Sequence, residues 1–134
     1  MMNDLMLSRL KDLKLSGVIK TLETRNEQAI KESISYMEFF ELLLSDEVAN
    51  RQNNGMKKRL QKAKFPQTKT LEEYKFNLQP TVNKRFIYNL ATCEFVRKKE
   101  NLALIGPPGT GKTHIGIALG IKAVTQGYRV LFTT

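Results

Sequence analysis

The residues Gly106–Thr113 have the types and the spacing that bind nucleotide phosphates. Their sequence fits the pattern of a glycine, four residues, a second glycine, a lysine, and a serine or threonine. Gly109 and Gly111 allow backbone conformations that a Cβ disfavours, so that successive amides can turn toward one anion. Lys112 would bridge the β- and γ-phosphates, and the Thr113 hydroxyl would ligate Mg²⁺. The pattern therefore predicts a site for a purine nucleoside triphosphate, above all ATP with Mg²⁺.

The segments on either side of this loop predict a strand before it and a helix after it, which is the context that this chemistry needs. Leu102–Ile105 is a short apolar run ended by glycine, as in a buried parallel strand. A helix is expected over Lys112–Gln126, with Gly127 in the left-handed position that closes it. Tyr128–Phe132 has the composition of a second strand, so the loop would lie in one right-handed βαβ unit. The predicted cofactor-binding residues are Gly106, Pro107, Pro108, Gly109, Thr110, Gly111, Lys112 and Thr113, of which Thr113 is also the metal ligand.

Hydrolysis of ATP would need further acidic residues, to complete the Mg²⁺ site and to orient water. The only run of this kind, Leu42–Glu47, precedes the loop and lies in a helical pattern, so we reject it as a metal site. The sequence ends two residues after the second predicted strand, and we expect a truncated chain that binds ATP without hydrolysing it. No catalytic residue is predicted, and whether the chain is an enzyme stays open. His114 is expected to pack or cap at the helix start, and Cys93 to be a small buried residue.

The first third of the chain predicts helices that pack on one another. Apolar residues recur at helical spacing, and breaks are expected at Ser16-Gly17 and near Asn26. Ser35 and Glu38 form a capping box at the start of a longer helix. Behind it runs an apolar stripe that we expect in the core, consisting of Tyr36, Phe39, Phe40, Leu43, Leu44 and Val48. The predicted fold class is thus α/β, a helical domain followed by a strand–loop–helix–strand start of a parallel sheet. The predicted domains are residues 1–66, a connector over 67–100, and 101–134.

The charge of the chain is uneven along its length. Residues 1–50 have a balance of −3 and residues 51–134 a balance of +12, which together give the net charge of +9. The run Arg51–Lys64 has six basic residues and no acidic one. Several cations close together along a helix favour contact with a nucleic-acid backbone, without base readout. A solvated charged surface is the alternative. The predicted DNA-binding residues are Arg51, Lys57, Lys58, Arg59, Lys62 and Lys64.

Composition excludes several other classes of protein. No apolar run approaches the roughly 20 residues of a membrane helix, and the charged residues of Met1–Leu13 do not fit a signal peptide. With one cysteine the chain can form no internal disulfide. We therefore expect a cytoplasmic protein with no membrane partner.

Three segments resemble the IstB-type transposition helpers and the related DnaC/DnaI helicase loaders, which belong to the AAA+ ATPases. They are Leu10–Leu22, Ser35–Leu44 and Glu100–His114, and the resemblance covers essentially the whole chain. It implies an N-terminal helical domain and an AAA+ domain in which Gly106–Thr113 is the Walker A loop. The chain departs from the family in lacking the second acidic motif (Walker B), the sensor residues and the arginine finger.

The resemblance also implies what such a protein does. Its members bind ATP, form homo-oligomers on DNA when full length, and recruit a transposase or a replicative helicase. The expected function is therefore an ATP-binding helper of DNA transposition that contacts duplex DNA without sequence preference. A helicase loader and an inactive remnant of either protein are the alternatives.

Overall fold

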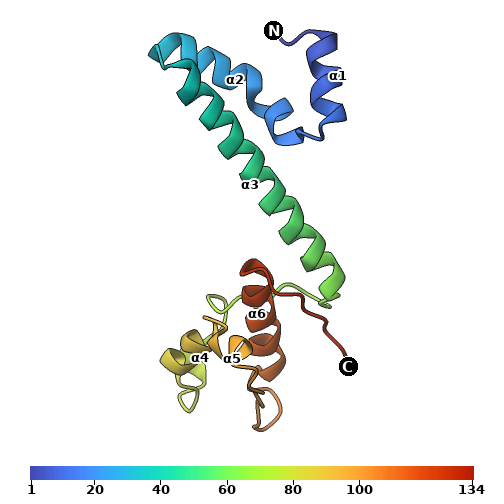
Figure 1. Ribbon diagram of the computed structural model, residues 1–134. Helices are drawn as coiled ribbons and strands as arrows, with labels where there is room; N and C mark the ends of the chain where they lie inside the picture. The colour runs from blue at the N-terminus through green and yellow to red at the C-terminus, as the bar shows by residue number, and fades with distance from the viewer. The chain divides into compact units, whose positions relative to one another are not determined.

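The computed structural model describes all of residues 1–134, and its regular structure is helical throughout (Figure 1). Two compact units are present, Met1–Gly55 and Met56–Thr134, and one helix runs through the boundary between them. The division into 1–66, 67–100 and 101–134 stays a prediction. No helix combines the length and the apolar character needed to cross a bilayer. The helices are α1 (Asp4–Asp12), α2 (Ser16–Glu32), α3 (Tyr36–Ala63), the 3₁₀ helix η1 (Phe76–Leu78), α4 (Lys84–Leu90), α5 (Glu94–Arg97) and α6 (Lys112–Thr125).

The predicted α/β fold is wrong, because the structure contains no strand and no sheet. Leu102–Ile105 has the alternating burial of a strand, since Leu102 and Leu104 pack partly against the core whereas Ile105 is 94% exposed. A strand also needs a neighbour that supplies ladder hydrogen bonds, and none pairs with this segment. In Tyr128–Phe132 the amide of Phe132 donates instead to the carbonyl of Ala63, 2.8 Å away at the end of α3. The expected strand–loop–helix–strand unit is therefore a loop and a helix between two extended segments.

Helices were predicted correctly in the first unit, but their boundaries differ. Asn26, near which a break was expected, lies inside α2, and α3 continues without interruption through Asn54 and Gly55. Ser35 caps α3 as expected, because its hydroxyl oxygen accepts from the amide of Glu38 at 3.1 Å. Local capping chemistry thus fixed the start of α3, while the break signals were too weak to stop a helix.

Polar contacts join α2 to the first half of α3 in the first unit. The Arg25 guanidinium donates to both carboxylate oxygens of Asp46 at 2.9 and 2.8 Å, and this holds the pKa of Asp46 down at about 2. The neighbouring Glu47 is buried. The two acids that we rejected as metal ligands are thus both engaged in joining helices.

The buried Glu47 carboxylate also caps α2 from outside. The residue before α2, Leu15, has no side chain that can cap it, and Glu47 instead accepts from the amide of Val18 at 3.0 Å. Arg51 donates to the other carboxylate oxygen at 3.0 Å. Desolvation raises the pKa of Glu47, but the hydrogen bonds from Arg51 and from the backbone amides outweigh it, and the pKa is lowered. The carboxylate is therefore charged, which suits the positive end of α2.

The apolar stripe on α3 is only partly in the core, contrary to prediction. Leu43 is buried and Phe39 half-buried. The other members of the stripe, Tyr36, Phe40, Leu44 and Val48, are between 49% and 93% exposed. The reason is that the face of α3 turned to α2 centres on Leu43 and Glu47, and the stripe extends beyond that face.

In the second unit α6 is the helix on which the core is built. Its buried residues meet the turn before η1 and the buried face of α4. The core residues are Leu71, Tyr74, Ile87, Ala91, Ile115, Ala118 and Leu119. The helix closes as predicted, because Gly127 has φ +98° and the amide of Tyr128 donates to the carbonyl of Ala123 at 3.1 Å. Cys93 is 2% exposed, as expected, and burial raises the pKa of its thiol.

We expect the substitution Gly17→Ala to lower the free energy of unfolding by about 1 to 3 kcal/mol. A Cβ at Gly17 would lie 2.8 Å from the Cβ of Asn50 and 2.9 Å from the Cα of Glu47, so the two helices would have to separate. Urea denaturation followed by far-ultraviolet circular dichroism measures the change. Gly116→Ala in α6 is the matched control, because nothing lies within 4 Å of its Cβ position. There alanine should stabilise the helix by about 0.5 to 1 kcal/mol. The same effect at both positions would contradict the close packing at Gly17.

Candidate nucleotide-binding site

The loop before α6 has the backbone that its glycines predict. Gly109 has φ +79° and Gly111 has φ +84°, both in the left-handed region. Gly111 is the N-cap of α6, and no side chain caps the first amides of that helix. These amides are therefore available to an anion, and the positive end of the helix dipole adds to their attraction.

Lys112 and Thr110 hold the loop together from inside. The Lys112 ammonium donates to the carbonyl oxygens of Gly106 and Pro107, the second at 3.2 Å. The Thr110 hydroxyl donates to the same Pro107 carbonyl at 2.9 Å. The Lys112 side chain thus lies across the loop and does not extend into solvent. Thr113, the next residue, is exposed. The loop gathers one cation, one exposed hydroxyl and the free amides of a helix start.

A turn formed by Thr70–Tyr74 packs against this loop and against α6. The Tyr74 hydroxyl donates to the carbonyl of Thr110 at 2.6 Å. His114 contacts the Thr70 carbonyl at 2.7 Å; because a carbonyl only accepts, Nε2 of His114 carries the proton. The rings of Tyr74 and His114 are edge to face, with centroids 5.4 Å apart. His114 therefore packs at the helix start, as the sequence analysis expected.

Beside the loop lies a cleft of about 380 Å³, a volume that suits a small ligand. One wall is the loop, with Lys112, and the other comes from the segment around α4, with Thr81, Val82 and Ile87. Most of the lining is apolar, and no acidic side chain contributes to it. A phosphate chain on the loop could therefore continue into an uncharged, largely apolar space.

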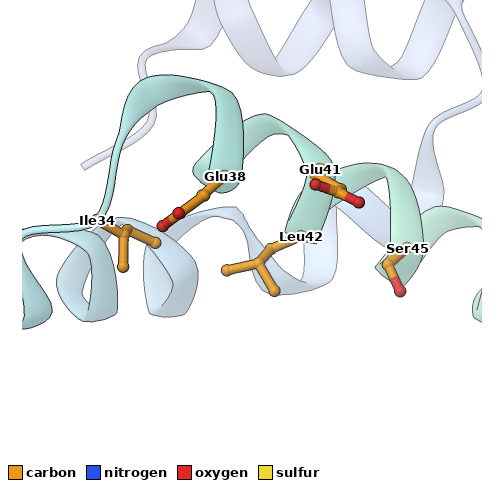
Figure 2. Close-up of a pocket in the computed structure, with 5 residues that line it drawn as sticks. All are labelled: Ile34, Glu38, Glu41, Leu42 and Ser45. Carbon is orange, nitrogen blue, oxygen red and sulfur yellow. The ribbon is translucent and has the colours of Figure 1, made fainter.

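A second hollow, of about 360 Å³, lies on α3 in the first unit and has the opposite character (Figure 2). Its lining consists of Ile34, Glu38, Glu41, Leu42 and Ser45. Figure 2 shows Ile34 just before α3, Glu38 between it and Leu42, and Glu41 and Ser45 on the same helix. The two carboxylates in this lining would repel phosphate, so the cleft beside the loop is the candidate nucleotide site.

Two of the six predicted DNA-binding cations are engaged within the protein. Arg51 pairs with Glu47 and also donates to the carbonyl of Lys14 at 3.4 Å. Arg59 is half-buried, and its guanidinium donates to the carbonyl of Val124 at 3.3 and 3.2 Å, at the end of α6. Arg59 therefore acts as a cap for the negative end of a helix. The other four, Lys57, Lys58, Lys62 and Lys64, are exposed.

Tyr74 and the residues of the opposite cleft wall were not predicted as part of the site. They lie in residues 67–100, which were expected to be a connector, and no motif there pointed to the loop. Tyr74 and Thr110 are 36 positions apart, and contacts of that range leave no periodic signal in the sequence.

We expect Arg59→Gln to lower the free energy of unfolding by about 1 kcal/mol, because the charged cap at the end of α6 is removed. Lys58→Gln is the matched control: it removes the same charge from the adjacent, exposed position on α3 and should change stability by less than about 0.5 kcal/mol. Thermal unfolding of both variants and the parent makes the comparison. If the two variants melt alike, the Arg59 cap does not stabilise the fold.

The family model and the similar proteins that match this chain all point to the same family. The family model described as IstB-like ATP binding protein matches residues 8–134. An ATP-binding protein of insertion sequence IS21 from Pseudomonas aeruginosa is 45% identical, over 96% of this chain and 48% of its own length. One of insertion sequence IS5376 from Geobacillus stearothermophilus is 39% identical, over 81% of this chain and 43% of its own. An insertion-sequence ATP-binding protein from Mycobacterium tuberculosis is 34% identical, over 92% and 49%. The chain thus spans about half the length of the curated relatives it matches.

Proposed function

This chain belongs to the family of IstB-like ATP-binding proteins, and we propose that it binds Mg-ATP through Gly106–Thr113 as a helper of DNA transposition. The observation that carries the proposal is the loop itself. It combines two glycines in the left-handed region, the uncapped start of α6 and the Lys112 ammonium in eight residues. These are the parts that a triphosphate requires.

Each residue of the loop would make a different contact with the triphosphate. The amides between Gly109 and Thr113 would donate to phosphate oxygens, with the α6 dipole behind them. Lys112 would exchange its carbonyl partners for the β- and γ-phosphates, which offer stronger, charge-assisted hydrogen bonds. Thr113 would offer its exposed hydroxyl to Mg²⁺, which supplies charge neutralisation between phosphates when bound.

The nucleoside would occupy the cleft beside the loop. Val82, Ile87 and Ile115 give it apolar walls that suit the face of a purine, and Thr81 gives a hydroxyl at its edge. Because no carboxylate lines the cleft, nothing in it repels the phosphates, and nothing in it completes a Mg²⁺ site or orients water for hydrolysis. The proposal for this chain is therefore nucleotide binding.

We expect Lys112→Ala to weaken Mg-ATP binding by at least about 100-fold, because it removes the one charged side chain of the loop and its charge-assisted hydrogen bonds. Isothermal titration calorimetry with Mg-ATP measures the affinity. Lys122→Ala is the matched control, since it lies on the same helix away from the loop and removes only an exposed ion pair with Glu72. Equal affinity in Lys112→Ala and the parent would remove the basis of the proposal.

The role in transposition rests on the relatives. Those described above are named as ATP-binding proteins of insertion sequences, which favours a transposase as the partner over a replicative helicase. We propose that the full-length protein assembles as a homo-oligomer on duplex DNA and works there with the transposase. Recovery of a replicative helicase, and not of the transposase, from cells expressing the protein would favour the helicase-loader alternative.

Contact with DNA would use the lysines of α3 that the fold leaves exposed, namely Lys57, Lys58 and Lys62, with Lys64 just after the helix. Each phosphate that a lysine neutralises releases condensed counterions, so the affinity should fall steeply with salt. The side chains along this run offer no pair placed for base edges, and sequence preference should be slight.

We therefore expect Lys57, Lys58 and Lys62 changed together to Gln to weaken duplex binding and to reduce the salt slope by about 0.9 for each phosphate that is no longer neutralised. Arg59 is left unchanged, so that the cap on α6 stays intact. Fluorescence anisotropy of a labelled duplex at several salt concentrations gives affinity and slope. In the control variant, Lys11, Lys20 and Lys31 of the first unit are changed together to Gln. A triple variant that keeps the parent's slope would show that this run does not contact DNA.

A further inference from the structure

We infer that Tyr74 is a positioning residue for the nucleotide loop, which orients the Gly111 amide toward the phosphates. The inference rests on the proposed function of the loop and adds to it a residue that lies outside the motif. Tyr74 is 8% exposed and reaches the loop from a turn 36 positions earlier in the chain.

The peptide that joins Thr110 to Gly111 is trans and planar, so its carbonyl and its N–H point in opposite directions. The Tyr74 hydroxyl holds the Thr110 carbonyl at 2.6 Å, on the side of the core. The Gly111 N–H must therefore point away from the core, and it has no acceptor within the protein. Fixing one end of the peptide sets the direction of the other.

The ring of Tyr74 adds a second constraint on the same residue. A Cβ on Gly111 would lie 2.6 Å from Cε2 of Tyr74, whereas a Cβ on Gly109 would meet nothing within 4 Å. The two glycines are thus needed for different reasons: Gly109 only for its backbone angle, and Gly111 also because the tyrosine ring lies against it. The Tyr74 ring therefore supports the loop at Gly111, the same residue whose amide the Tyr74 hydroxyl orients.

Further contacts hold the turn that carries Tyr74. Leu71 is fully buried in the core. Nε2 of His114 donates to the Thr70 carbonyl at 2.7 Å, and the rings of His114 and Tyr74 lie edge to face with centroids 5.4 Å apart. His114 of α6 therefore contacts the turn both at its start and at Tyr74, which leaves the hydroxyl little freedom to move. A donor held in this way pre-orients an amide, and less ordering remains to be done when an anion binds.

The test compares two substitutions that remove the same atom. Tyr74→Phe deletes the hydroxyl and keeps the ring that packs on Gly111. Tyr88→Phe deletes a hydroxyl from another ring of the same unit, which packs with Phe76 and makes no hydrogen bond through its oxygen. Calorimetric titration with Mg-ATP is made on the parent and both variants of the full chain. The amide resonances of protein labelled with ¹⁵N-glycine are recorded without nucleotide.

We expect Tyr74→Phe to bind Mg-ATP about fivefold more weakly, the loss of one hydrogen bond, and to displace the Gly111 resonance, with neither change in Tyr88→Phe. Equal ATP affinity in Tyr74→Phe and the parent overturns the positioning role and leaves the proposed function standing. Weaker binding without a displaced Gly111 resonance, or weaker binding in both variants, also overturns it, because a general loosening would then be the cause. A parent that binds no ATP overturns the proposed function itself, a result that the titration separates from the others.

Discussion

The second unit depends on the packing of the turn Thr70–Tyr74 against the first half of α6. A 14-residue helix is marginal in water by itself, and α6 begins without a side-chain cap. Its stability comes from burying Ile115, Ala118 and Leu119 against Leu71 and the buried face of α4. Since the nucleotide loop ends where α6 begins, the direction of the helix and of its free amides depends on the same packing.

The loop itself has little burial to hold its shape. Gly106–Gly109 are exposed, and Gly109 has no neighbour that a Cβ would meet. Its conformation is determined at its ends and by hydrogen bonds across it, from Lys112 to Gly106 and Pro107 and from Thr110 to Pro107. Such a loop can exchange internal carbonyl contacts for phosphate oxygens without disturbing the core. The core thus lies on one face of α6, the proposed anion contacts lie at its first turn, and Tyr74 contacts both.

Features with local causes were predictable from the sequence. The Ser35 cap, the Gly127 closure and the conformations of Gly109 and Gly111 each follow from a few neighbouring residues. The strands were wrongly predicted because a strand needs a second strand, often distant in sequence, to supply ladder hydrogen bonds. Leu102–Ile105 has the alternating burial of a strand but no such neighbour. The prediction that the apolar stripe on α3 is buried was only partly right, for a similar reason. Glu47 caps α2 from a buried position, and this contact decides which side of the stripe is covered. Tyr74 was missed because it meets the loop only in the folded chain.

The basic residues show why charge counted along a sequence overstates a binding surface. Arg51 and Arg59 belong to the same run as the exposed lysines, yet one pairs with a buried carboxylate and the other caps α6. An arginine has a planar group with several donors, which suits carbonyl and carboxylate partners inside a fold, whereas a lysine keeps a hydrated point charge outside. The two proposed phosphate sites of the second unit therefore differ in physical form. The loop would offer fixed amides and one held lysine to a compact triphosphate, and the end of α3 would offer exposed cations whose attraction salt screens readily.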